Sequence, residues 1–231
     1  MATVDSDQPT KIVVMFGPPG SGKGTQARRL ADELGYIQIS TGDLLRSAVE
    51  AQSTLGLIAK ATMEAGGLVS DDIVLALLKE RLAEPDTQAG VIFDGYPRTV
   101  AQAKALDLLL KRSGQRVGKV VELKVNDDEL VERITGRHTC ADCGEGYHIR
   151  FKRPKLEGVC DVCGGTRFKR RADDTAETVR TRLSEYYEQT LPVLSYYVPK
   201  GAVSTLDGAD SVDEVFADLM SVVSAKSRVD T

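Results

Sequence analysis

The 231-residue sequence lacks the features typical of membrane, secreted and nucleic-acid-binding proteins. It contains no run of about 18 apolar residues, which argues against a transmembrane helix. Its first ten residues are polar and show no secretory signal, so we expect a cytoplasmic protein with a flexible tail over residues 1–10. The net charge of −4 gives the protein no overall electrostatic attraction to nucleic acid.

Cysteine is scarce, and no internal repeat or low-complexity tract is present. The cysteines follow the spacing C-x₂-C-x₁₆-C-x₂-C, which is typical of a tetrahedral zinc site on two turns; they are Cys140, Cys143, Cys160 and Cys163. Four thiolates leave no open coordination position, so we predict a structural metal, with iron or cobalt as alternatives to zinc. Disulfides, redox catalysis, or His138 or His148 replacing one cysteine are weaker alternatives.

The most informative positive feature is a glycine-rich segment that follows an apolar run at 12–16. Residues 17–25 read Gly-Pro-Pro-Gly-Ser-Gly-Lys-Gly-Thr and follow the phosphate-loop pattern G-x-x-x-x-G-K-[ST], with Gly24 between Lys23 and the hydroxyl residue Thr25. Apolar residues then recur with helical spacing until Gly35, so a helix starting near Lys23 would direct its positive end at the phosphates. The segment predicts a nucleoside triphosphate site, in which Lys23 contacts the β- and γ-phosphates and Thr25 offers a hydroxyl to Mg²⁺.

Short apolar runs alternate with helical patterns along the rest of the chain, which predicts an α/β fold with a parallel sheet and helices on both faces. The predicted strands after the first cover 36–39, 91–93, 120–125 and 202–206. Helix starts are predicted at Thr99, Asn126, Asp174 and Ser211, each three residues before Glu or Gln. Two insertions interrupt the pattern: 41–70 is predicted to form two small helices, whereas 137–171 lacks helical periodicity and holds all the cysteines.

Six arginines lie at the edges of predicted sheet-end loops or insertions: Arg46, Arg98, Arg133, Arg137, Arg171 and Arg182. A guanidinium group binds phosphate oxygens in a bidentate manner, as phosphoryl transfer requires. Any single one could instead form a surface ion pair. Arg133 and Arg137 are four residues apart, so we predict that they share a helix face and touch one ligand.

Five ordered segments resemble the signature motifs of the adenylate kinase family: residues 17–25, 40–46, 94–99, 134–137 and 171–174. The resemblance extends over 11–225. It implies a P-loop NTPase-type five-stranded parallel sheet as the core, formed by 11–40, 71–136 and 172–231. It also implies that 41–70 is the AMP-binding insertion and that 137–171 is a long lid with a Cys₄ zinc site.

The resemblance further implies a monomeric kinase that catalyses the Mg²⁺-dependent reaction ATP + AMP ⇌ 2 ADP, with no nucleic acid or membrane partner. The implied ATP-binding residues are Gly20, Ser21, Gly22, Lys23, Gly24, Thr25, Arg133 and Arg137. The implied AMP-binding residues are Thr41, Arg46, Gly67, Val69, Gly95, Arg98, Gln102, Arg171 and Arg182. Thr25 and Asp94 are implied to hold Mg²⁺, Asp94 through water, and the implied catalytic residues are Lys23, Arg98, Arg137, Arg171 and Arg182.

No general base is expected, because the acceptor oxygen of AMP is already anionic at neutral pH. Relatives that use UMP or CMP usually have alanine in place of Thr41, so Thr41 favours AMP by resemblance. Gln102 would contact adenine, although it could instead serve only to cap the helix at Thr99.

Two alternatives remain. Another nucleoside monophosphate kinase, or a GTP-using AMP phosphotransferase, would share these motifs and differ in its base contacts. A zinc-knuckle nucleic-acid-binding protein is suggested by the basic segment 137–171, but the intact Lys23 and Asp94 and the acidic net charge argue against it.

Overall fold

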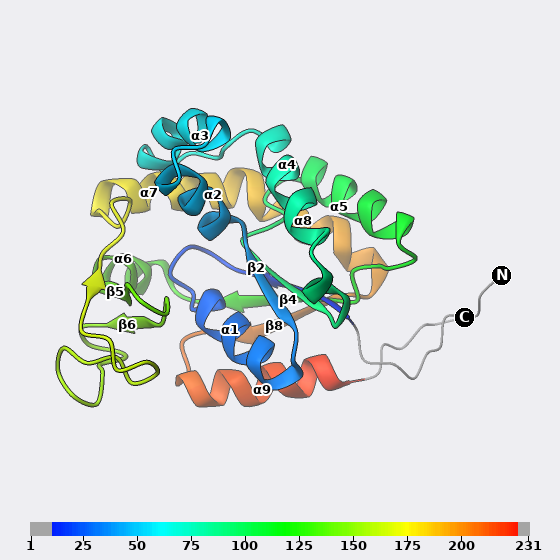
Figure 1. Cartoon of the computed structure of the whole chain (residues 1–231). Helices are drawn as coiled ribbons and strands as arrows, with labels where there is room; N and C mark the ends of the chain where they lie inside the picture. The colour runs from blue at the N-terminus through cyan, green and yellow to red at the C-terminus, as the bar shows by residue number, and fades with distance from the viewer. Residues whose placement is uncertain (1–10, 226–231) are drawn as a thin grey trace.

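The computed structural model describes residues 11–225, so the predicted tail at 1–10 lies outside the described residues (Figure 1). Five strands form a parallel sheet in the order β2-β3-β1-β4-β8. Their bounds are Ile12–Phe16 (β1), Ile37–Ser40 (β2), Val91–Asp94 (β3), Lys119–Lys124 (β4) and Val203–Asp207 (β8). The parallel α/β fold is confirmed, and each predicted strand lies within one residue of the observed one.

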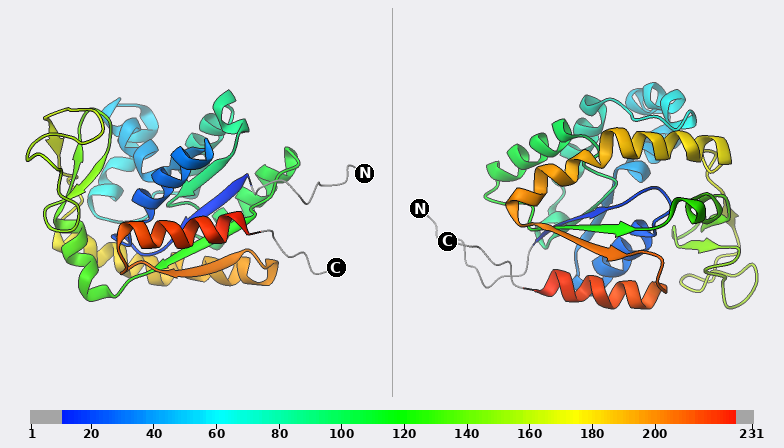
Figure 2. Two further views of the ribbon diagram at one scale, coloured as in Figure 1. Left: turned by 90° about the horizontal axis from the view of Figure 1, so that it is seen from below. Right: turned by 180° about the vertical axis from the view of Figure 1, so that it is seen from behind.

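Helices cover both faces of the sheet, which explains why its central strand is a continuous apolar run (Figure 2). Val13 and Met15 pack on one face with α1 (Lys23–Leu34) and α9 (Val212–Ser224). Val14 and Phe16 pack on the other face within a second core. The helices that contribute to this second core include α4 (Asp71–Leu82), α5 (Val100–Arg112) and α8 (Pro192–Tyr197).

The first insertion contains α2 (Thr41–Glu50) and α3 (Thr54–Glu64), so the predicted pair of small helices is confirmed. The two helices pack closely at Gly56. A Cβ atom there would lie 2.1 Å from the carbonyl oxygen of Ala48, so no larger residue fits at this position.

The second insertion follows α6 (Asp127–Thr135) and contains a small antiparallel sheet in the order β6-β5-β7. Its strands are Arg137–Cys140 (β5), Gly146–His148 (β6) and Phe168–Lys169 (β7). The buried core of this segment consists only of Cys140, Tyr147 and Cys160, with Cys143 and Phe168 packed against it. Such a small core cannot stabilise the segment by itself, and a metal ion bound by the cysteines can supply the missing stabilisation.

The prediction that Arg133 and Arg137 share a helix face is wrong. Helix α6 ends at Thr135, and Arg137 begins β5 paired with His148. The side chain of His148 packs against the end of the helix, where its Nε2 atom lies 3.1 Å from the carbonyl oxygen of Glu132. The chain therefore passes from α6 into the small antiparallel sheet after one residue, Gly136.

The prediction that Asp174 caps the following helix is also wrong. Thr175 is the N-cap of α7 (Ala176–Glu185) and accepts a hydrogen bond from the amide of Thr178. The Asp174 carboxylate is instead held by two arginines, Arg137 and Arg182.

The other predicted caps are present. Thr99 accepts from the Gln102 amide, and Ser211 forms a reciprocal capping box with Glu214. Asn126 caps α6 through the amide of Asp128. A π-helical turn at Tyr186–Thr190 joins α7 to α8, and a 3₁₀ turn at Val198–Lys200 ends α8. Within 11–225, no helix combines the length and apolar character needed to span a bilayer.

Candidate active site

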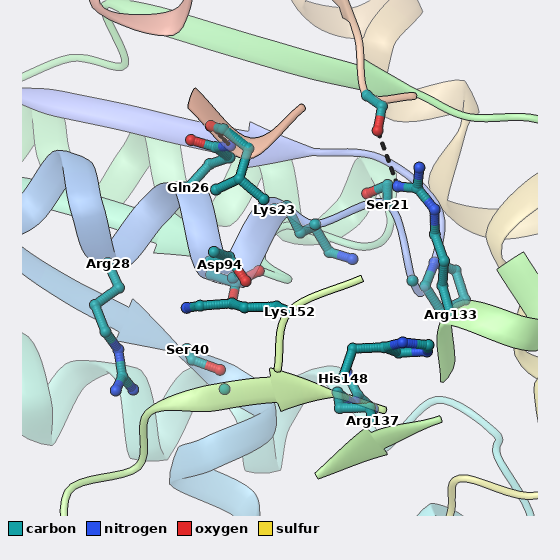
Figure 3. A pocket seen from close by; sticks show the side chains of 18 of the residues that line it. Ser21, Lys23, Gln26, Arg28, Ser40, Asp94, Arg133, Arg137, His148 and Lys152 are labelled. Atoms are coloured by element: carbon teal, nitrogen blue, oxygen red, sulfur yellow. Dashed lines mark hydrogen bonds between the residues drawn. The ribbon is translucent and has the colours of Figure 1, made fainter. Parts of the chain in front are cut away.

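A cavity of about 570 Å³ lies at the carboxyl ends of the central strands, between the phosphate loop and the two insertions (Figure 3). This is the edge at which open parallel sheets bind ligands. The cavity is lined by every residue implied to bind ATP and by Asp94. Of the residues implied to bind AMP, it is lined by Arg46, Gly95, Arg98, Arg171 and Arg182.

The phosphate loop presents backbone amides to this cavity. Gly22 has a left-handed conformation (φ +89°) and precedes α1, whose N-terminus has no side-chain cap. Ser21 is buried, and its hydroxyl has no hydrogen-bond partner among the described residues. The uncapped amides in the first turn of α1 and the positive end of this helix form an anion site.

Lys23 reaches into the cavity from the first turn of α1, and its Nζ donates to the carbonyl of Pro18 at 3.1 Å. Desolvation lowers the pKa of Lys23 to about 8, and repulsion from nearby arginines, of which Arg98 is the strongest, contributes. Asp94 opposes this shift only in part. The site therefore destabilises its own positive charge until an anion enters.

Asp94 ends β3 and is the acidic group facing the phosphate loop (Figure 3). Its Oδ2 accepts from the Gln38 side chain at 3.3 Å and would lie 3.0 Å from a Cβ atom at position 24. Gly24 therefore allows the carboxylate to approach the start of α1, beside Thr25, which also lines the cavity. Carboxylate and hydroxyl oxygens are ligands that suit Mg²⁺.

The arginines from the second half of the chain are held by carboxylates. Arg137 binds Asp174 with two hydrogen bonds of 2.9 and 2.5 Å. Arg182 lies 3.1 Å from Asp173 and 3.5 Å from Asp174, whose side chain is 3% exposed. These contacts orient the guanidinium groups while leaving them on the cavity wall.

The remaining arginines lie closer to α2. Arg171 lies 3.4 Å from Asp43, which also binds Arg46. Burial lowers the pKa values of Arg98 and Arg171 to about 10, and repulsion from neighbouring arginines adds to the effect. An excess of positive charge thus lies between the two insertions, where a phosphate group would relieve it.

Four residues implied to bind AMP do not line the cavity: Thr41, Gly67, Val69 and Gln102. The Thr41 hydroxyl donates to the carbonyl of Gly95 at 2.7 Å. The Gln102 side chain accepts from the Arg98 amide and donates to Asp71, both at 2.7 Å. Both side chains therefore support the 95–98 loop. The backbone amide of Gln102 also donates to the hydroxyl of Thr99, as predicted for the helix cap.

Residues of the second insertion that the sequence motifs do not reveal complete the cavity wall, including Tyr147, His148, Phe151 and Lys152. The Phe151 ring lies 4.6 Å from the His148 ring, and the Arg133 guanidinium lies 5.6 Å from the Phe151 centroid. Arg133 also donates to the carbonyl of Gly208 at 2.9 Å (Figure 3). The aromatic rings and the guanidinium group form a surface beside the phosphate loop that is suited to stacking of an aromatic base. The sequence does contain a signal for this surface, because Phe151 lies between the basic residues Arg150 and Lys152.

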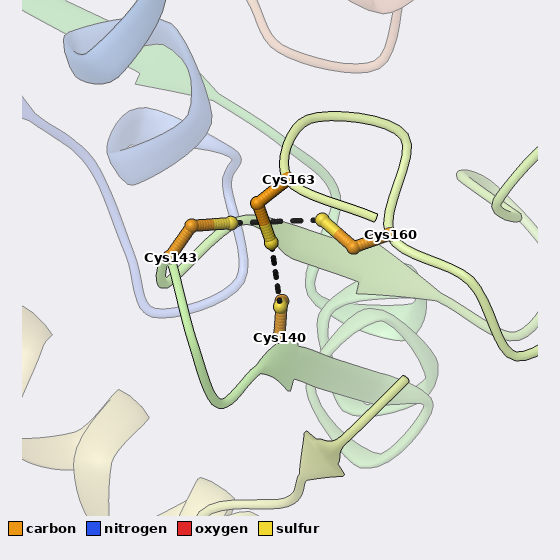
Figure 4. Close-up of side chains that lie close together, drawn as sticks. All are labelled: Cys140, Cys143, Cys160 and Cys163. Atoms are coloured by element: carbon orange, nitrogen blue, oxygen red, sulfur yellow. Dashed lines mark hydrogen bonds between the residues drawn. The ribbon is translucent and has the colours of Figure 1, made fainter. Parts of the chain in front are cut away.

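The four cysteine sulfurs converge in the second insertion, all within 4.8 Å of one another (Figure 4). The close pairs join the two turns, with Cys140 and Cys163 at 3.6 Å and Cys143 and Cys160 at 3.5 Å. These separations are too long for disulfides. A zinc ion about 2.3 Å from each sulfur would hold the sulfurs about 3.8 Å apart, so the arrangement fits a tetrahedral site.

Comparison with known proteins agrees with this geometry. A family model described as adenylate kinase matches residues 15–202. An adenylate kinase of Novosphingobium aromaticivorans is 53% identical over 214 residues, covering 93% of this chain and 99% of that protein. One from Sphingopyxis alaskensis is 56% identical over 206 residues, covering 89% and 94%. With the phosphate loop, the arginine cluster and the two insertions in place, the chain belongs to the adenylate kinase family, whose reaction is reversible phosphoryl transfer from ATP to AMP.

Proposed function

We propose that the 570 Å³ cavity is where the γ-phosphoryl group of ATP passes to AMP, giving two ADP. The observation that carries this proposal is the excess of desolvated positive charge between the phosphate loop and α2, on Lys23, Arg98, Arg171 and Arg182. Phosphoryl transfer is catalysed mainly by positioning and by neutralising the charge on the transferring oxygens. These side chains meet both requirements.

For the donor, the triphosphate lies along the amides of residues 20–25, with Lys23 at the β- and γ-phosphates. The adenine stacks on the surface that Arg133 and Phe151 form together. Arg137 binds the transferring phosphoryl group from the lid side. Its guanidinium group is oriented for this contact by Asp174.

For the acceptor, Arg46 and Arg98 bind the AMP phosphate, and Arg171 and Arg182 lie on its other side. Thr41 and Gln102 hold the 95–98 loop in position, and the segment containing Gly67 and Val69 borders the base. Support comes from packing at the neighbouring Gly66, where a Cβ atom would lie 3.2 Å from the Arg182 side chain.

Magnesium enters with ATP, and Asp94 and Thr25 are the residues that would hold it, Asp94 through water. The ion supplies charge neutralisation on the phosphate oxygens. The fit is supported by the close approach of the Asp94 carboxylate to Gly24 at the start of the phosphate-binding helix.

Among the described residues, we assign 41–70 to an AMP-binding insertion and 137–171 to a lid, with 11–40, 71–136 and 172–225 as the core; residues 226–231 of the predicted core lie outside the described residues. Closure of both insertions excludes water from the transfer. A zinc ion on the four cysteines staples the lid and takes no part in the chemistry. All the residues assigned to the site come from one chain, which supports action as a monomer. ATP, AMP and ADP as substrates support a cytoplasmic location.

The test is a coupled assay of ADP formation with a panel of donors and acceptors. ATP with AMP should exceed every other pair by a wide margin. Faster turnover with GTP as donor, or with UMP or CMP as acceptor, would instead support one of the related kinases. Thr41→Ala serves as the matched variant, and we expect a higher KM for AMP with an unchanged KM for ATP.

A further inference from the structure

Arg28 connects the donor helix to the lid. It extends from α1 at the opposite end of the cavity from Arg133 (Figure 3). Its Nη1 donates to the carbonyl of Cys143 at 3.4 Å and lies 3.7 Å from the Glu145 carboxylate. Its Nη2 would lie 3.3 Å from a Cβ atom at Gly144. The guanidinium group therefore lies over three consecutive residues of the first cysteine turn.

The Glu145 carboxylate is well placed to transmit this contact. It is 16% exposed, and its second oxygen pairs with Lys152 within the lid. Another contact that crosses to the lid, between Lys169 and Glu50, joins side chains that are 55% and 67% exposed. Exposed pairs of that kind contribute little, whereas a sheltered carboxylate shared by two cations is held more firmly.

The position of Arg28 on α1 gives the contact a function. It lies five residues after Lys23, about 7.5 Å along the same helix, so it is rigidly linked to the phosphate loop. A lid turn docked on this side chain is fixed relative to the bound triphosphate. The apparent affinity for a ligand rises with the population of the state able to bind it.

We propose that Arg28 is a positioning residue that holds the first cysteine turn of the lid onto the donor helix, and so raises the affinity for ATP. It acts through Glu145 and the Cys143 carbonyl, without contacting the transferring group. The inference rests on the proposed roles of the phosphate loop as donor site and of residues 137–171 as the lid.

The test compares steady-state kinetics of the Arg28→Ala variant with the unmodified enzyme. We expect the KM for ATP to rise by about three- to tenfold, with the KM for AMP and kcat within about twofold. Arg28→Lys should recover part of the loss, because it keeps the charge opposite Glu145. Hydrogen exchange at residues 141–146, measured with a non-hydrolysable ATP analogue, should be faster in Arg28→Ala.

The matched control is Arg167→Ala, which removes the same charge from an exposed lid pair with Asp142 that does not reach α1. Its KM for ATP should stay unchanged. In a Glu145→Gln background, Arg28→Ala should lose at least half of its effect.

An equal effect in both backgrounds would overturn the proposal, since the Glu145 carboxylate would then transmit none of the effect of Arg28. A matching rise in the KM for AMP, or an unchanged KM for ATP, would overturn it as well. These results can be distinguished from failure of the proposed function, in which case the unmodified enzyme would form no ADP from ATP and AMP.

Discussion

Replacing Asp174 with asparagine tests whether the arginine cluster stores unfavourable charge that substrate phosphates relieve. Asp174 is 3% exposed, binds Arg137 in a bidentate manner and lies 3.5 Å from Arg182. Breaking a buried ion pair from one side costs about 3–5 kcal/mol. The two arginines are 24% and 20% exposed and the amide still accepts one hydrogen bond, so we expect a smaller loss of about 2–3 kcal/mol.

For a chain of 231 residues, this loss corresponds to a fall in Tm of about 4–12 °C. Substrate phosphates should restore part of the missing negative charge. A non-hydrolysable ATP analogue with AMP should therefore raise the Tm of the variant more than that of the unmodified protein. Differential scanning calorimetry with and without these ligands measures both quantities.

Asp86→Asn is the control, because Asp86 also binds an arginine, Arg81, with two hydrogen bonds of 2.7 Å, but on the surface. It should change the Tm little, since exposed pairs contribute little. If Asp174→Asn lowers the Tm no more than this control does, or if ligands shift both proteins equally, the charge-storage argument fails.

Three further predictions follow from the site. Lys23→Met should lower turnover by about 10²–10³-fold with an unchanged circular dichroism spectrum, because it removes a charge aimed at the phosphates and little packing; a loss below tenfold would contradict this role. Because the folded-state pKa of Lys23 is about 8, below its unfolded value, kcat/KM for ATP should fall as pH rises through 8. Over the same pH range, the free energy of unfolding of the ligand-free protein should rise relative to that of Lys23→Met, because the folded state releases the Lys23 proton while the unfolded chain keeps it. A difference in unfolding free energy that does not change with pH would refute the lowered pKa. Chelation or Cys140→Ser should release about one metal ion and lower the Tm, because the lid core is otherwise too small to fold, while an unchanged Tm with no metal by elemental analysis would exclude a structural ion.

The strands and the phosphate loop were predictable because their signals are local. A strand buried on both faces must be apolar along its whole length, as β1 is, so its position can be read without knowing its neighbours. The loop needs glycine where the backbone is left-handed, as at Gly22, and a cation directly after it. The cysteine spacing is equally local, since each pair lies on one turn.

The errors came from competition between local and distant partners. Asp174 has the sequence context of a helix cap, yet its carboxylate pairs with Arg137, which is 37 positions away. Thr175 therefore takes over the cap. Gln102 contacts the predicted cap at Thr99, and its side chain also binds Asp71, 31 positions away, which the sequence did not reveal. A charged or amide side chain takes the partner that offers the larger gain, and spacing alone does not reveal that partner.

The sequence by itself determined the fold class, the phosphate-loop segment and the spacing of the four cysteines, because each depends on residues within one turn or one strand. Only the tertiary structure decided which carboxylates hold the arginines, that Phe151 lies beside Arg133, and that Arg28 meets the first cysteine turn. These contacts join segments far apart along the chain. Their strength depends on burial and on the distance between charges, which exist only once the chain has folded.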